Sequence, residues 1–184
     1  MNAYTVTDIS NMFHEFNVST KHNNDQNRHR EKKKYPSRAL LLACNNITCL
    51  NLQRDVGTRD EKQMIDLYEH MFGCVVAERN EEIIDMYLTL NNKTMYITGK
   101  IDGFVHGKNI LIEHKRRTRG LLHYVPFHEK VQCYMYMRMI GCKHAHLVES
   151  FGHHILVHTI TFRMDVWKSI CEKLSEKFKN NTKI

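Results

Sequence analysis

Two short stretches, Gly99-Lys100-Ile101-Asp102-Gly103 and Ile112-Glu113-His114-Lys115, are predicted to lie on the two strands of one β-hairpin. Side chains alternate between the two faces of a strand, so Glu113 and Lys115 point to the same face. A carboxylate and an ammonium group are therefore expected side by side on this part of the sheet.

The turn between the two strands sets which residues face each other. If Gly107 and Lys108 form a two-residue hairpin loop, Asp102 lies opposite Glu113. Two carboxylates then share one patch, and Mg²⁺ prefers such oxygen ligands. A lysine beside them can hold an attacking water or stabilise charge that develops on a phosphate. The same register pairs His106 with Asn109 and Lys100 with Lys115.

Acidic and basic residues that alternate on a hairpin can also form nothing more than a solvated face with weak cross-strand pairs. The neighbouring residues argue against this alternative. Ile110, Leu111 and Ile112 form a continuous apolar run, which is typical of a strand buried on both faces. A carboxylate at the end of such a strand is costly to bury unless it is paired or binds a metal ion.

Length and composition indicate one compact domain. The chain has 184 residues, of which 42% are hydrophobic, with few glycines and prolines, so it is long enough to bury a core. Its formal net charge of +7 favours an anionic partner, with nucleic acid ahead of a membrane surface.

The sequence points to an intracellular, reducing compartment. It contains no apolar run long enough to span a membrane and no secretory signal, so the chain is expected not to be secreted. Its six cysteines are scattered, which indicates free thiols rather than a disulfide framework.

The order of predicted elements indicates an α/β or α+β fold with a mixed sheet. Residues 1–56 are expected to form a helical and basic segment that packs on a core of residues 57–184, within a single domain. Helices are predicted over residues 8–16, 57–72 and 126–140 and from residue 165 onward, and strands over residues 74–78, 83–90, 94–105, 109–116, 144–151 and 153–162.

Glu61 lies on the apolar face of its predicted helix, one turn before Ile65, so its carboxylate is expected to point toward the sheet. It could there add a third acidic group. The alternative is a capping box with Thr58, in which the glutamate binds the backbone at the helix start.

Gln132 and Tyr136 lie four residues apart and so share one face of a helix that is apolar nearly all round. Such a helix is expected in the core. An amide and a phenol there could find ordinary partners, but a neighbouring site of carboxylates and lysine would also supply them.

Five arginines could neutralise the phosphates of a nucleic acid bound near this site. Three follow Lys115 directly, and two lie near the start of the helix that carries Glu61, although such runs are also typical of solvated loops. The five are Arg54, Arg59, Arg116, Arg117 and Arg119.

A structural zinc site is a weaker hypothesis. Cys142, His144 and His146 alternate on one predicted strand face, but their spacing matches no zinc motif and the chain has no paired CxxC.

Four motifs in order resemble those of the PD-(D/E)xK nuclease superfamily, in its RecB-like and lambda-exonuclease-like branch. They are Gly57-x-x-x-Glu61, the Gly99–Gly103 stretch with Asp102, Glu113-His114-Lys115 and Gln132-x-x-x-Tyr136. The resemblance implies a restriction-endonuclease-like core, a central mixed β-sheet flanked by helices.

The resemblance also implies hydrolysis of phosphodiester bonds with one or two Mg²⁺ or Mn²⁺ ions. The implied metal ligands are Asp102, Glu113, Glu61 and the backbone carbonyl of His114. The implied catalytic residues are Asp102 and Glu113 again, with Lys115 to activate water and with Gln132 and Tyr136 to support the lysine and the scissile phosphate.

The expected function is that of a DNA nuclease, and of an exonuclease in particular, that leaves 5′-phosphate products in recombination, repair or replication. Ile101 stands where many relatives have proline, and only Cys171 follows the core, so no iron–sulfur cluster is expected. No GxxxxGK[ST] loop is present, so a helicase or recombination partner would be a separate chain.

Three alternatives stay open. The chain could be an endonuclease that acts on DNA or RNA, a non-catalytic nucleic-acid-binding module on the same fold, or a zinc-stabilised interaction protein.

Overall fold

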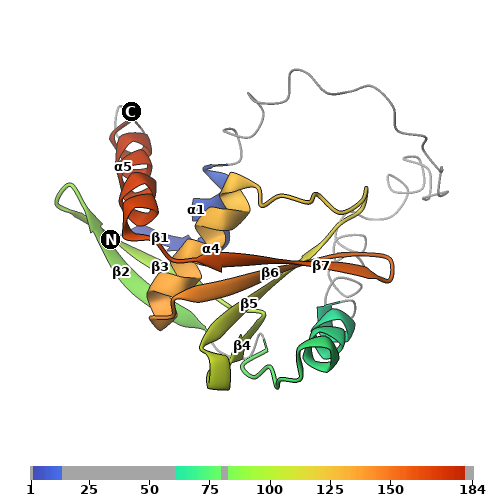
Figure 1. Ribbon diagram of the computed structural model, residues 1–184. Helices are drawn as coiled ribbons and strands as arrows, with labels where there is room; N and C mark the ends of the chain where they lie inside the picture. Colours follow the sequence, from blue (N-terminus) through green and yellow to red (C-terminus); the bar gives the residue numbers. More distant parts are fainter. Residues whose placement is uncertain (1, 14–60, 80–82, 181–184) are drawn as a thin grey trace, which may run out of the picture.

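The computed structural model describes residues 2–13, 61–79 and 83–180 (Figure 1). The strands of this part of the chain form two mixed sheets, one of three strands in the order β1-β3-β2 and one of four in the order β4-β5-β6-β7. The mixed α/β class is therefore confirmed, although the sheet that the sequence predicted as one is divided into two.

The four-stranded sheet carries most of the candidate site. Its strands are β4 (Gly103–Val105), β5 (Ile110–Arg116), β6 (His144–Phe151) and β7 (His154–Thr161). β5 and β6 are parallel because α4 (Phe127–Ile140) carries the chain back between them, whereas the other neighbours are antiparallel.

The β4–β5 hairpin has the predicted register but a different turn. Gly103 pairs with Ile112 and Val105 with Ile110, as the sequence predicted. The loop, however, has four residues and contains the 3₁₀ turn η2 (His106–Lys108). Asn109, rather than Gly107, takes the left-handed conformation with φ of 52°, which asparagine tolerates better than most residues.

The three-stranded sheet consists of β1 (Asn2–Thr5), β2 (Ile84–Leu90) and β3 (Lys93–Gly99). The sequence did not predict β1, which pairs in parallel with β3. The single strand predicted over residues 94–105 is wrong, because the chain leaves one sheet at Gly99 and enters the other at Gly103.

Residues 2–13, the part of the N-terminal segment that the structure describes, pack into the core. α1 (Val6–Asn11) begins at a capping box in which the Thr5 side chain and the Asp8 carboxylate bind each other's backbone. Val6, Ile9 and Phe13 are fully buried. The rest of residues 1–56, with the basic stretch predicted there, lies outside the described residues.

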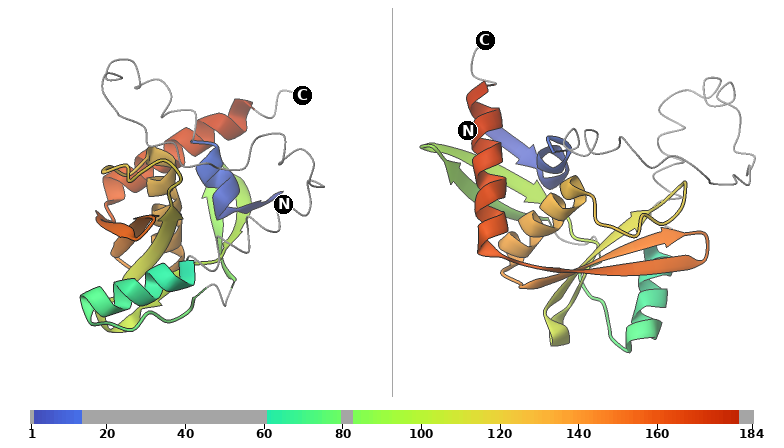
Figure 2. Two further views of the ribbon diagram at one scale, coloured as in Figure 1. Left: turned by 90° about the vertical axis from the view of Figure 1, so that its right-hand side faces the viewer. Right: turned by 45° about the horizontal axis from the view of Figure 1, so that its top comes forward.

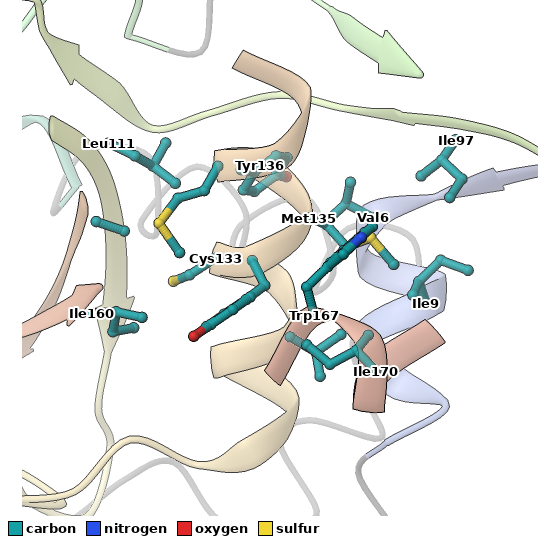
Figure 3. Packing of buried hydrophobic residues seen from close by; sticks show 14 of the residues in the cluster. Val6, Ile9, Ile97, Leu111, Cys133, Met135, Tyr136, Ile160, Trp167 and Ile170 are labelled. Carbon is teal, nitrogen blue, oxygen red and sulfur yellow. The ribbon is translucent and has the colours of Figure 1, made fainter. Parts of the chain in front are cut away.

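α4 lies between the two sheets (Figure 1). Residues from Val131 to Met137 are all buried, as expected for a helix that is apolar nearly all round. Their side chains contact α1, β5 and the C-terminal helix (Figure 3). α4 ends at Gly141, whose φ of 72° matches the predicted stop.

The other face of the four-stranded sheet is covered by the helix of residues 61–72, drawn in teal in Figure 1. Ile65 and Tyr68 pack there against Val105, Ile112 and Val148. The helix ends at Gly73, as predicted, with φ of 56°. The strand predicted over residues 74–78 is only one isolated bridge, between its alanine and β4.

α5 (Met164–Asn180) packs along α1 and the three-stranded sheet (Figure 2). Trp167, Ile170 and Leu174 are buried on the face that the sequence predicted. α5 begins at Met164, one residue before the predicted start, so Asp165 lies in its first turn. No helix in the described part of the chain is long and apolar enough to span a membrane.

Candidate active site

The lysine of the Glu113-His114-Lys115 motif links β5 to α4. Lys115 Nζ donates hydrogen bonds to Glu113 Oε1, at 2.7 Å, and to Gln132 Oε1, at 2.8 Å. The strand places Glu113 and Lys115 on one face because they lie two residues apart, and α4 covers that face. Three residues predicted to act together are thus in direct contact.

Asp102 lies in the short segment that leads from one sheet to the other. Its Oδ2 accepts a hydrogen bond from the backbone N–H of His114 at 2.7 Å, which fixes the carboxylate beside β5. Asp102 is also one residue before the Gly103–Ile112 pair, so it lies opposite Glu113 in the predicted register. The predicted pairing of Lys100 with Lys115 is wrong, because β4 begins only at Gly103.

The electrostatics of the cluster favour a bound cation. Burial, and then the nearby charge of Asp102, raise the pKa of Glu113 to about 8 despite the ion pair with Lys115. Burial disfavours the charged form of Lys115, but the attraction to the Glu113 and Asp102 carboxylates is the stronger effect, so the pKa of the lysine is raised. Lys115 therefore stays protonated at neutral pH.

Glu113 Oε2 is buried and has no hydrogen-bond partner among the residues that the structure describes. A buried carboxylate oxygen in this condition is costly, and a metal ion would satisfy it. With Asp102 beside it, the donor set fits a hard divalent cation such as Mg²⁺ or Mn²⁺.

Glu61 is not brought into a group of three with these carboxylates. Across residues 2–13, 61–79 and 83–180, no cluster of three or more His, Cys, Asp or Glu side chains is placed to hold a metal ion. The helix of residues 61–72 contacts the Ile112 face of β5, whereas Glu113 points to the opposite face. The role of Glu61 as a third ligand stays a prediction, and Thr58, its alternative partner, lies outside the described residues.

Gln132 joins Lys115 to Tyr136. Its oxygen accepts from the lysine, so its amide N–H is the group that hydrogen-bonds the Tyr136 hydroxyl. Burial, and then the charge of Glu113, raise the pKa of Tyr136, so it is a neutral phenol at physiological pH. Figure 3 shows Tyr136 on α4, among the buried residues between Leu111 of β5 and Val6 of α1.

The glycines that flank Asp102 leave room for two neighbouring side chains. A Cβ at Gly99 would lie 2.5 Å from Cε1 of Tyr136, and one at Gly103 would lie 2.3 Å from Cγ1 of Val76. Neither distance is compatible with a side chain, so both glycines let the segment with Asp102 pass close to its neighbours.

Arg117 does not match its predicted role as a phosphate ligand. Its guanidinium is nearly buried and forms a bidentate ion pair with Glu129 of α4, with N–O distances of 2.5 and 2.7 Å. A third contact, at 2.8 Å, reaches Glu149 of β6. The prediction was wrong because these two carboxylates, far away in the sequence, take up the arginine's charge.

Sequence reasoning missed Glu129 and Glu149, which are both buried. A signal existed for Glu149, since a glutamate inside the apolar strand predicted over residues 144–151 requires a partner. Arg116 and Arg119 are exposed, and their phosphate contacts stay a prediction; Arg54 and Arg59 lie outside the described residues.

The residues proposed for zinc are not assembled into a site in the described part of the chain. His146 instead contacts Tyr68, with 2.6 Å between its Nδ1 and the tyrosine hydroxyl.

Comparison with known proteins identifies the fold. No family model matches the chain, and no curated protein matches its sequence. Among solved structures, LHK-Exo in complex with dAMP is 17% identical, with a TM-score of 0.58 over 96% of this chain and 86% of its own. LHK-Exo from Laribacter hongkongensis, described as an alkaline exonuclease, is 16% identical, with a TM-score of 0.54 over 96% and 91%. The protein SSO0001 is 15% identical, with a TM-score of 0.59 over 98% and 77%.

The chain therefore shares its fold with these solved structures, the alkaline exonuclease LHK-Exo among them. Three of the four sequence motifs lie together in this fold. Asp102 lies at the crossing between the sheets, Glu113 and Lys115 lie on β5, and Gln132 and Tyr136 lie on the α4 face above them.

Proposed function

We propose that this protein is a metal-dependent nuclease that hydrolyses phosphodiester bonds. The observation that carries the proposal is the position of Lys115, which is hydrogen-bonded to Glu113 and Gln132 beside the carboxylate of Asp102. A protonated lysine here lies next to two carboxylates, one of which has a buried oxygen without a partner among the described residues. This arrangement suits phosphoryl transfer to water better than it suits a purely structural ion pair.

Asp102, Glu113 and the His114 carbonyl would hold the metal ion. The N–H of His114 points to Asp102, and in a strand the carbonyl of the same residue points to the same side. Bound there, Mg²⁺ or Mn²⁺ would polarise the scissile phosphate and lower the pKa of a bound water.

The chain's own residues would position the reacting groups. Glu113 and Gln132 accept two of the three N–H groups of the Lys115 ammonium, and the third would donate to the attacking water. Gln132 keeps the lysine aimed at this point because its oxygen holds one of the three N–H groups. Tyr136 fixes the amide of Gln132 and, as a neutral phenol, is available to donate to the phosphate.

We propose DNA as the substrate and removal of nucleotides from an end as the reaction. The net charge of +7 suits a polyanion, and the exposed Arg116 and Arg119 lie at the end of β5 and in the loop that follows it. LHK-Exo is described as an alkaline exonuclease and was solved with dAMP, which supports the same choice for this fold.

Cleavage of DNA labelled at its 5′ or 3′ end, single- or double-stranded, with Mg²⁺, Mn²⁺ or EDTA, tests the proposal. Asp102→Asn keeps an oxygen for the His114 N–H but removes the charge, so it should abolish cleavage without unfolding the protein. Glu176→Gln, on the exposed side of α5, is the matched control and should cleave normally.

Cleavage that needs a metal ion and is lost in Asp102→Asn would support the nuclease, and the label pattern would give its direction. Equal cleavage by Asp102→Asn would contradict it. Salt-sensitive binding without cleavage under any metal would favour a non-catalytic binding module.

A further inference from the structure

The loop between β5 and α4, residues 117–126, is held in place by buried charges. Arg117 at its start is fixed by Glu129 and Glu149, and its backbone N–H donates to the Ser150 carbonyl at 2.7 Å. The second oxygen of Glu149 accepts the backbone N–H of Leu122, also at 2.7 Å. One buried carboxylate thus fastens both the start and the middle of the loop.

This attachment places the loop next to the candidate active site. Glu149 is the register partner of Lys115 in the parallel β5–β6 pair, so their side chains share one face and their backbones lie about 4.8 Å apart. Leu122 is bound to the Glu149 carboxylate above that face. Tyr124, two residues further on, lies at most about 7 Å along the chain from Leu122.

The loop presents polar and aromatic side chains to solvent. Tyr124 is 50% exposed, and Arg119 and His123 are exposed as well. His123 also has a φ of 59°, a left-handed conformation that a residue with a side chain adopts at a cost. The buried contacts of Glu149 with Arg117 and Leu122 thus fix the loop next to His123, which has this unfavourable backbone conformation. The exposed side chains of the loop do not pack in the core.

We propose that this loop is a preformed binding surface for a single nucleic-acid strand, on which the Tyr124 ring stacks with an unpaired base near the scissile phosphate. The proposal deepens the proposed function and rests on it. Aromatic rings beside a basic groove bind single strands in this way, because every base offers a flat face when it is unpaired. Arg119 supplies the phosphate contact, and Arg117 serves as the buried anchor rather than as a ligand.

A single strand is the occupant that this surface fits best. The bases inside a duplex already stack on their neighbours, so a side-chain ring reaches a base face only at an unpaired or frayed position. A tyrosine close to Lys115 would accordingly hold the end of one strand open at the catalytic residues.

The test uses a DNA strand with 2-aminopurine near its end, with EDTA present so that the measurement does not depend on cleavage. Stacking on Tyr124 should quench the 2-aminopurine fluorescence when protein is added. Tyr124→Ala should remove the quenching and weaken binding of the single strand about tenfold or more, and Tyr124→Phe should retain both. Tyr87→Ala, at an exposed tyrosine of the other sheet, is the control and should behave as wild type.

Quenching and affinity that are unchanged in Tyr124→Ala would overturn the loop proposal, as would equal losses in Tyr124→Ala and Tyr124→Phe. Metal-dependent cleavage by the wild type would in either case leave the nuclease proposal standing. A wild-type protein that neither cleaves nor binds DNA would instead overturn both.

Discussion

The Glu113 carboxyl group is buried next to a second carboxylate, and a bound metal ion would stabilise its charged form. Its carboxyl group is buried beside Asp102, and one of its oxygens lacks a partner in the described structure, yet it pairs with Lys115 through the other. Burial and the neighbouring carboxylate favour the protonated form, whereas a metal ion requires the carboxylate.

The metal affinity should therefore depend on pH. Because the pKa of Glu113 is raised to about 8, a proton competes with the metal below that pH and not above it. Affinity for Mn²⁺ should rise about tenfold per pH unit between pH 6 and 8 and then level off. Calorimetric titration in two buffers of different ionisation enthalpy measures the proton release. An affinity that does not change over this range would contradict the prediction.

Gly99 has no side chain, and this leaves room for the ring of Tyr136, one of the candidate site residues. Gly99→Ala would force its Cβ into the Tyr136 ring, so we expect a loss of about 1–3 kcal/mol of stability and reduced cleavage. Gly107→Ala is the matched control, since a Cβ there meets no atom of the described residues within 4 Å. Thermal unfolding of both variants gives the comparison. Similar unfolding temperatures for the two would show that Tyr136 can move aside at little cost.

At the scale of elements, β5 and α4 are joined by two parallel links. Lys115 reaches Gln132, and two residues later Arg117 reaches Glu129, one turn earlier in the helix. The ion pair between Arg117 and Glu129 thus sets how α4 lies on the strand, and with it how Gln132 meets Lys115.

Removing this ion pair should cost stability rather than DNA affinity alone. Arg117→Met would leave Glu129 and Glu149 buried without their cation, so we expect a loss of about 3–5 kcal/mol in the free energy of unfolding. Arg119→Met, in the exposed part of the same loop, should change stability by less than about 0.5 kcal/mol. Denaturant titration separates the two. A small effect of Arg117→Met would mean that the two carboxylates are protonated or hydrated in its absence.

The sequence correctly predicted the elements that the spacing of their own residues is enough to define. The two-residue period placed Glu113 and Lys115 on one strand face, where they form an ion pair, and the helical spacing placed Gln132 and Tyr136 on one helix face. The turn at Asn109 was missed because several loop types give the same register. The burial of Arg117 could not be foreseen, because its partners become neighbours only when α4 and β6 fold against β5.

At the scale of the whole molecule, the site lies where the chain passes between two sheets. A periodic pattern that runs on through residues 94–105 gives no sign of this crossing, so the sequence predicted one strand there. In the structure, Asp102 belongs to the crossing segment, and its carboxylate accepts a hydrogen bond from the His114 N–H of β5. The position of the Asp102 carboxylate thus depends on how the two sheets lie relative to each other.

A bound metal ion should therefore stabilise the whole fold, because it would tie this crossing segment to β5. At a Mn²⁺ concentration of about 100 times its Kd, linkage predicts a gain of about 2.7 kcal/mol. For a chain of this size, that gain corresponds to a rise of roughly 5–10 °C in Tm. Differential scanning calorimetry with and without Mn²⁺ measures the shift. Asp102→Asn and Glu113→Gln should lose it, whereas Glu176→Gln should keep it. If Asp102→Asn showed the full shift, the ion would be bound elsewhere and would not tie the crossing segment to β5.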